Sequence, residues 1–364
     1  MPNKRILCLI DGLGTGGAER QMIGLVLCLK QRGYDVDLVK YHEMNNYGEL
    51  LKSYGIVPVT LSPKGSAVSK LLAIRKYIKS RGGYDCLIAY KDGPCMIGCL
   101  LKLMCGKFKL IVSERNTSQK LSTKENIKFK LYRLADSIVP NSYSQEKFIK
   151  GHFPSLAGKT ETITNYTDID MFVPGEDKTE DGLVRVLTTA RVVRQKNVLR
   201  YLDAIALLRE RGVNNVHFDW YGSSQKGQED YFKSVGDKVI ELKLQDYVTF
   251  HPATDTVLEK YQQCSFFCLP SNYEGYPNVI CEAMSCGKPI VCSRVCDNPY
   301  IVREGENGLF FDNTSVQDMA DKLQYMIEQS ADLRREWGAK SRELAETLFS
   351  MQAFADKYIS LIEK

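Results

Sequence analysis

The chain has 364 residues, of which 44% are hydrophobic and 26% are charged, and its formal net charge at neutral pH is +5. This composition excludes a disordered or fibrous chain, and the length allows two domains of ordinary size. No window of about 20 residues is free of charge, so we expect no membrane-spanning helix.

The N-terminus and the cysteines indicate a reducing compartment. Basic residues precede a short apolar run, but Asp11 ends that run before it reaches the length of a signal peptide. The chain has 12 cysteines, which would cross-link at random in an oxidising environment. The cysteine pairs spaced four residues apart have no histidine at metal-ligand spacing, so we expect buried thiols and no bound metal. These features predict a cytoplasmic protein.

Apolar runs alternate with helix-like stretches in both halves of the chain. This alternation predicts two parallel sheets covered by helices, an α/β fold of two doubly wound domains. The strands expected in the first half lie at 5–11, 35–41, 56–61, 85–90, 108–112 and 137–140. Those expected in the second half lie at 184–190, 215–222, 247–251, 265–270, 288–293 and 308–311.

The domain boundaries follow from the break in this alternation. We expect a first Rossmann-like domain at 1–168, a linker at 169–182 that is rich in acids and lacks periodicity, and a second Rossmann-like domain at 183–349. Residues 350–364 are expected to form a helix with one apolar face.

The first predicted strand runs into the stretch DGLGTGGAE at residues 11–19. Gly12, Gly14 and Gly17 have the spacing of a dinucleotide-binding turn, and such a turn offers backbone N–H groups to any phosphate. For NAD, an acidic residue should end the second strand about 20 positions on. The candidate, Glu43, lies too far along the chain for a close fit. The turn therefore predicts a phosphate site and leaves an NAD-dependent oxidoreductase open.

The first half of the chain is strongly basic. Residues 1–170 contain 26 Lys and Arg against 15 Asp and Glu, a formal charge of +11, whereas the remainder carries −6. The segment 69–83 places Leu71, Ile74 and Ile78 on one helical face with basic residues around it. Such a helix can lie on an anionic membrane surface, or it can pack on a sheet with a solvated basic rim. We find no nucleic-acid recognition motif.

Two cations follow the first strand of the second half. Arg191 and Lys196 lie in the stretch TTARVVRQKN at 188–197, at the carboxyl end of the strand, where open α/β sheets bind ligands. A departing nucleoside diphosphate gains negative charge, and two fixed cations can stabilise it without a metal.

Two carboxylates flank the start of a later helix. The stretch PSNYEGYPNVICEAMSCGKP at 270–289 predicts a helix over 277–285, with Pro277 in its first turn. Glu274 precedes this helix and Glu282 lies two turns into it, roughly 12 Å apart at about 1.5 Å per residue. Paired glycosidase carboxylates are only about 5 to 9.5 Å apart, so this pair better fits the two hydroxyl-rich ends of a nucleotide sugar. The backbone N–H groups of Tyr276, Asn278 and Val279 would face the phosphates between those ends.

With these motifs, and with NPYIVREGENGLFF at 298–311, the chain resembles glycosyltransferase family 4, the group 1 glycosyl transferases. The resemblance implies a retaining enzyme of the GT-B fold, in which two Rossmann-like domains face each other across a cleft. It implies that the domain at 1–168 binds the acceptor, that the domain at 183–349 binds the nucleotide sugar, and that the helix at 350–364 joins the first domain. It implies that Glu282 holds the ribose, Glu274 the donor sugar, and Arg191 and Lys196 the diphosphate.

Members of the family commonly carry a histidine near the reacting carbon, where this chain reads Ser113-Glu114-Arg115-Asn116. We therefore expect Arg115 and Asn116 to contact the sugar or the acceptor. The expected catalytic residues are Glu274, Arg191 and Lys196. The expected nucleotide-sugar contacts are Gly16, Gly17, Arg191, Lys196, Glu274, Gly275, Tyr276, Pro277, Asn278, Val279 and Glu282.

The expected function is transfer of a hexose or N-acetylhexosamine from a UDP- or GDP-linked donor to a lipid-linked or growing surface-polysaccharide acceptor, such as a capsule or lipopolysaccharide chain. We expect no cofactor and no metal, and attachment to the inner face of the cell membrane. Three alternatives remain: a nucleotide-sugar epimerase of the GT-B fold, an NAD-dependent oxidoreductase, and a non-catalytic nucleotide-sugar sensor.

Overall fold

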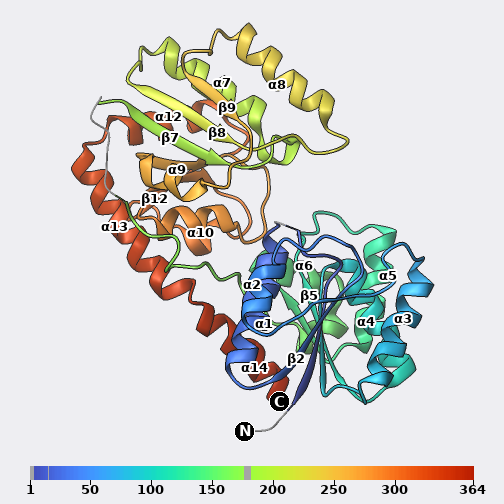
Figure 1. Cartoon of the computed structure of the whole chain (residues 1–364). Coiled ribbons are helices and arrows are strands. Elements are labelled where there is room, and N and C mark those ends of the chain that lie inside the picture. Colours follow the sequence, from blue (N-terminus) through green and yellow to red (C-terminus); the bar gives the residue numbers. More distant parts are fainter. Residues whose placement is uncertain (1–3, 15, 176–181) are drawn as a thin grey trace. The chain divides into compact units, whose positions relative to one another are not determined.

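A computed structural model describes residues 4–14, 16–175 and 182–364 of the chain, which form two compact units (Figure 1). Unit 1 comprises Met1–Tyr166 together with Met351–Lys364, and unit 2 comprises Thr167–Ser350. Within the predicted linker, residues 176–181 lie outside the described residues. Phe172, in the described part of the linker, is buried in a hydrophobic cluster of unit 2.

The sheet of unit 1 contains six parallel strands in the order β3-β2-β1-β4-β5-β6. β1 from Ile6 onward and the whole of β4 are buried, because helices cover both faces of the sheet. The strands are β1 (Arg5–Leu9), β2 (Asp35–Lys40), β3 (Val59–Thr60), β4 (Cys86–Tyr90), β5 (Lys109–Glu114) and β6 (Ser137–Pro140). The edge strand β3 is shorter than the predicted 56–61, because Pro58 has no N–H group for the strand ladder.

Helices of unit 1 include one from the C-terminal end of the chain. They are α1 (Gly17–Gln31), α2 (Gly48–Ser53), α3 (Ala67–Ser80), α4 (Asp92–Cys105), α5 (Thr123–Leu131), α6 (Tyr143–His152) and α14 (Met351–Glu363), with short 3₁₀ turns η1 (Tyr132–Leu134) and η2 (Pro154–Lys159). Helix α14 packs against α1, and its Tyr358 is fully buried in the same core cluster. An ion pair of 2.6 Å between Lys4 Nζ and Glu363 Oε2 joins the start of β1 to the end of α14.

The sheet of unit 2 repeats this topology in the order β12-β11-β10-β7-β8-β9, again with parallel strands. Its strands are β7 (Val184–Thr189), β8 (Val216–Tyr221), β9 (Val248–His251), β10 (Phe266–Leu269), β11 (Ile290–Ser293) and β12 (Gly308–Phe311). Its helices are α7 (Val198–Glu210), α8 (Glu229–Glu241), α9 (Val257–Gln263), α10 (Asn278–Ser285), α11 (Asn298–Ile301), α12 (Val316–Glu328) and α13 (Ala331–Leu348), and η3 (Arg194–Lys196) is a 3₁₀ turn. The two doubly wound sheets confirm the predicted fold class.

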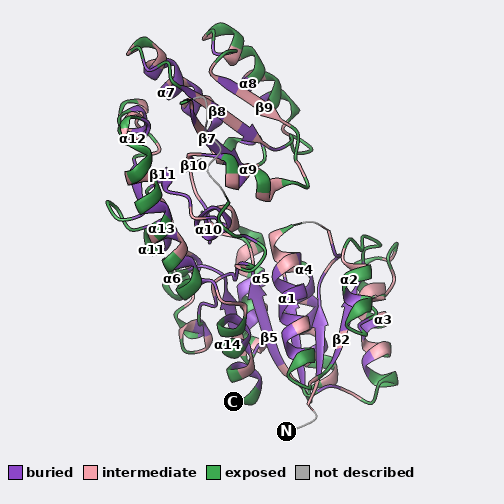
Figure 2. Ribbon diagram, turned by 60° about the vertical axis from the view of Figure 1, so that its left-hand side comes forward, coloured by how far each residue is buried: buried purple, intermediate pink, exposed green. Residues whose placement is uncertain are grey.

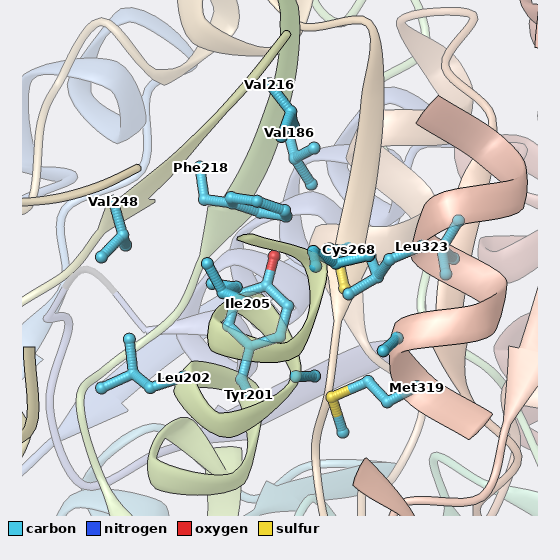
Figure 3. Packing of buried hydrophobic residues seen from close by; sticks show 14 of the residues in the cluster. Val186, Tyr201, Leu202, Ile205, Val216, Phe218, Val248, Cys268, Met319 and Leu323 are labelled. Atoms are coloured by element: carbon cyan, nitrogen blue, oxygen red, sulfur yellow. The ribbon is translucent and has the colours of Figure 1, made fainter. Parts of the chain in front are cut away.

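The strands β4, β10 and β11 are buried along their whole length, whereas the edge strands β3 and β9 are partly exposed, and most helices have one buried and one exposed face (Figure 2). In unit 2, Tyr201 of α7 lies between Phe218 of β8 and Cys268 of β10, with aliphatic side chains around it (Figure 3). This packing fixes the carboxyl ends of β7 and β10, where the predicted site residues lie. Across the described parts of the chain, no helix combines the length and the apolar character needed to cross a bilayer.

Candidate donor site in unit 2

The candidate site lies where two neighbouring strands end. β7 and β10 pair in parallel, so their carboxyl ends meet at one edge of the sheet. The turn after β7 carries Arg191 and Lys196, and the loop after β10 carries Glu274. The structure therefore places residues about 80 positions apart in the sequence on one edge, as the doubly wound topology requires.

Lys196 and Glu274 form an ion pair at this edge. The Lys196 Nζ lies 2.5 Å from Glu274 Oε1, and the two side chains are 12% and 9% exposed. The hydroxyl of Ser271 donates to the same carboxylate oxygen at 2.5 Å. Because an ammonium has three N–H donors, the bond to Glu274 leaves two for another partner. The site thus offers a cation and a carboxylate within reach of one ligand.

Arg191 is exposed, and its side chain is hydrogen-bonded away from the Lys196–Glu274 pair. Its Nη1 donates to Gln225 Oε1 at 2.6 Å, on the segment that follows β8. No carboxylate pairs with Arg191 among the residues that the structure describes. Its guanidinium therefore keeps its charge available for an anion at the surface of unit 2.

Glu282 is buried in the second turn of α10, and its carboxylate is hydrogen-bonded by a tyrosine of a neighbouring helix. Tyr261 of α9 donates to Glu282 Oε2 at 3.0 Å, and the same hydroxyl lies 2.7 Å from Thr189 Oγ1 at the end of β7. Burial, and then the neighbouring carboxylate of Glu282, raise the pKa of Tyr261 well above its usual value. The hydroxyl therefore stays protonated and orients the carboxylate.

The first turn of α10 departs from the prediction by one residue. Pro277 is the N-cap of the helix, with ψ of 108°, and the helix begins at Asn278. The prediction that Pro277 lies inside the first turn is therefore wrong. The carbonyl of Pro277 accepts from the N–H groups of Ile280 and Cys281. The N–H groups of Asn278 and Val279 precede these donors and belong to the first turn of the helix, at its N-terminal end. Gly275 and Tyr276 lead into this turn, and Tyr276 is buried.

The predicted residues of unit 1 lie at the carboxyl edge of its own sheet. Gly16 is the N-cap of α1, and Gly17 is its first residue. Arg115 follows β5, and its guanidinium donates to Asn165 Oδ1 at 2.9 Å and to Tyr358 Oη at 2.7 Å. These contacts connect β5 to α14 within unit 1. Asn116 is exposed. The acceptor role of both residues stays a prediction.

Sequence reasoning missed Ser271 and Tyr261. Ser271 precedes Glu274 by three residues, and this local spacing is a signal that could have identified it. Tyr261 is 21 residues from Glu282 and on a different helix, so no local pattern indicates their contact. Across the described residues, no group of three or more His, Cys, Asp and Glu side chains could hold a metal ion.

The two units have the fold found in solved structures of GT-B glycosyltransferases. The structure of the Anabaena protein HepE in complex with UDP-glucose matches with a TM-score of 0.84 at 19% identity, over 99% of each chain. Sucrose-phosphate synthase from Thermosynechococcus elongatus matches with a TM-score of 0.83 at 20% identity, over 99% of this chain and 98% of the other.

Sequence comparison agrees with the family resemblance over part of the chain. Residues 174–344 match the family described as Glycosyl transferases group 1. A relative from Campylobacter jejuni, N-acetylgalactosamine-N,N'-diacetylbacillosaminyl-diphospho-undecaprenol 4-alpha-N-acetylgalactosaminyltransferase, is 24% identical over 96% of this chain and 98% of its own. An uncharacterized glycosyltransferase of Haemophilus influenzae is 25% identical over 94% and 96%. Over residues 174–344 the chain thus matches the group 1 glycosyl transferases, which supports the family resemblance.

Proposed function

We propose that this glycosyltransferase moves a hexose or N-acetylhexosamine from a UDP- or GDP-linked donor to a lipid-linked or growing surface-polysaccharide acceptor, with retention of configuration. The observation that carries this proposal is the Lys196–Glu274 pair at the carboxyl edge of the unit 2 sheet, with Glu282 on the next helix. At this edge of the sheet, Lys196 supplies a cation that can bind phosphate. Glu274 and Glu282 supply carboxylates that can bind hydroxyl groups.

Each of these residues has a role in the proposed reaction. Glu282, oriented by Tyr261, accepts hydrogen bonds from the ribose hydroxyls, and Glu274 accepts them from the donor sugar. Arg191 and Lys196 stabilise the diphosphate as it departs, because its negative charge increases when its bond to the sugar breaks. The N–H groups of Asn278 and Val279 add the partial positive charge of a helix N-terminus.

The proposed bond changes occur on one face of the sugar. The bond between the anomeric carbon and the phosphate oxygen breaks, and a bond from the acceptor oxygen to the same carbon forms. The acceptor proton passes to the departing phosphate oxygen. This route needs no serine or cysteine nucleophile from the protein, and we propose that it needs no metal or cofactor.

The names of relatives support the substrate classes. The Campylobacter enzyme acts on a diphospho-undecaprenol-linked sugar, and the HepE structures contain UDP or UDP-glucose. The match of residues 174–344 to a glycosyltransferase family favours transfer over the oxidoreductase alternative. A GT-B epimerase remains the second candidate, and it would consume donor in the absence of an acceptor.

The proposal is tested by incubating the full chain with a panel of UDP- and GDP-linked hexoses and N-acetylhexosamines and a lipid acceptor extract. Mass spectrometry should detect an acceptor that has gained one sugar, and NMR should show the donor's anomeric configuration in the product. Glu274→Gln should lower kcat/KM about 10- to 100-fold, the effect of one lost charge-assisted hydrogen bond, whereas the exposed control Glu241→Gln should not. Donor turnover without acceptor would instead support the epimerase.

We also propose a cytoplasmic location at the inner face of the cell membrane, with α3 facing anionic lipids. Ile74 and Ile78 of α3 pack into unit 1, whereas Val68 and Leu72 are 64% and 49% exposed. These two side chains are one helical turn apart, and exposed lysines accompany them on the same helix. Exposed apolar groups among basic residues support binding to an anionic bilayer.

A further inference from the structure

Lys91 has a backbone conformation that is nearly restricted to glycine. It lies between the end of β4 and the start of α4, with φ of 74° and ψ of 162°. A side chain in this region clashes with its own backbone, so non-glycine residues persist there only where the surroundings hold them. Strain of this kind concentrates at functional sites.

Two carboxylates hold the Lys91 side chain. Its Nζ lies 2.9 Å from Asp11 Oδ1 and 2.6 Å from Glu19 Oε1. The three side chains are 23%, 29% and 10% exposed, so solvent screens these ion pairs only in part. Burial alone would lower the pKa of Lys91, but its hydrogen bonds and charge interactions with Glu19 and Asp11 outweigh burial and raise it.

The two carboxylates lie at the two ends of the glycine-rich turn between β1 and α1. Asp11 begins this turn, and its Oδ1 also accepts from the N–H of Gly12 at 2.9 Å. Glu19 lies in the first turn of α1, where its Oε2 would be only 2.5 Å from a Cβ atom on Gly16. The Glu19 carboxylate thus covers Gly16, and a single ammonium connects the start of the turn to its end.

The strand-to-helix segment that carries Lys91 is itself anchored. The N–H of Lys91 donates to the carbonyl of Ser113 at 3.2 Å, and its carbonyl accepts from the N–H of Cys95 at 3.0 Å. The next residue, Asp92, pairs with Lys128 at 3.1 Å and with Lys124 at 3.2 Å. These contacts keep the backbone of Lys91 in place, and its side chain then reaches the turn from a fixed point.

We propose that Lys91 is a positioning residue that holds together the two ends of the β1–α1 turn, so that the N–H groups of Gly16 and Gly17 at the start of α1 can meet the donor phosphate. The structural part of this proposal concerns unit 1 alone. The part that concerns the donor rests on the proposed function.

Three variants separate the charge of Lys91 from its backbone conformation, and a fourth variant is the control. Lys91→Arg keeps the charge, and Lys91→Ala and Lys91→Gly both remove it. Glycine accepts the native φ and ψ whereas alanine does not, so the Gly variant should unfold at a higher temperature than the Ala variant. Lys107→Met, at an exposed lysine of unit 1, is the control.

Hydrogen exchange of the full chain tests the positioning role without any substrate. In Lys91→Gly and Lys91→Ala, exchange in the peptide 11–19 should rise at least 10-fold, while exchange in β6 should stay at the wild-type rate. Lys91→Arg should restore protection, and Lys107→Met should match the wild type. Unchanged exchange in peptide 11–19 of both charge-removing variants would overturn the proposal.

Kinetics test the connection to the donor. Because the turn binds phosphate in both the ground state and the transition state, Lys91→Gly should raise the donor KM about 10-fold and change kcat less than 3-fold. Altered exchange with an unchanged KM would refute the connection to the donor and leave the positioning of the turn standing. Absence of transfer by the wild type would instead refute the proposed function.

Discussion

At the level of single residues, the site of unit 2 is built from charges that neutralise one another. Lys196 and Glu274 are largely withdrawn from water, and an isolated charge in that position would cost several kcal/mol. Their attraction at 2.5 Å offsets this cost, and the hydroxyl of Ser271 satisfies the same carboxylate oxygen. In the proposed reaction the donor adds partners to both groups, so neither charge needs to be exposed alone.

The functional residues proposed in the two units were predictable to different degrees. Lys196, Glu274 and Glu282 follow strands or begin a helix, so local spacing was enough to place them at the carboxyl ends of the sheet. Tyr261 and Lys91 were not predictable, because their roles depend on contacts with distant segments. Lys91 in particular looks in the sequence like an ordinary basic residue beside Asp92, and only its φ angle and its two carboxylate partners distinguish it.

Among the structural elements, α10 and α13 of unit 2 approach so closely that a glycine is required. A Cβ atom on Gly338 of α13 would lie 2.1 Å from the carbonyl oxygen of Gly287, just beyond α10. The neighbouring atom belongs to the backbone and cannot rotate away. The close packing of these helices supports the helix that carries Glu282.

This packing gives a matched pair of predictions. Gly338→Ala should destabilise the protein by about 1–3 kcal/mol, because the extra methyl group overpacks the contact between helices. Gly236→Ala, in α8 with open space around it, should stabilise it by about 0.5–1 kcal/mol, since alanine has the better helix propensity. Denaturant unfolding of the full chain measures both, and shifts of the same sign would refute this account of the contact.

The helix and strand boundaries show what the sequence pattern can resolve. The strands of unit 2 were predicted to within two residues, because each is a short apolar run bounded by polar or turn residues. The length of the strand predicted at 56–61 was overestimated. The apolar run continues past Pro58, but Pro58 has no N–H group to bond to the neighbouring strand, so the strand is shorter than the run. The start of α10 differed by one residue because Pro277 suits the N-cap and the first turn alike.

For the whole molecule, the alternation of strands and helices was enough to predict two doubly wound sheets.

The positive charge of the first half of the chain predicts binding to anionic membranes. We expect the full chain to sediment with vesicles that contain phosphatidylglycerol and to remain in solution with pure phosphatidylcholine. Replacing Lys76 and Lys79 of α3 by glutamine should weaken binding by about 2 kcal/mol, roughly 30-fold. The matched control in unit 2 replaces the exposed Lys226 and Lys233. Equal weakening by both pairs would contradict a role for α3.

The central claim is that unit 2 holds a nucleoside diphosphate through Lys196. The most direct test is a thermal unfolding titration of the full chain with UDP, GDP and NAD. UDP or GDP should raise the unfolding temperature, with a stabilisation of about 2.7 kcal/mol at 100 times Kd. Lys196→Met should abolish most of this stabilisation, whereas Arg194→Met should retain it, because Arg194 packs over Tyr231 instead. Stabilisation by NAD alone, or equal loss in both variants, would contradict the account.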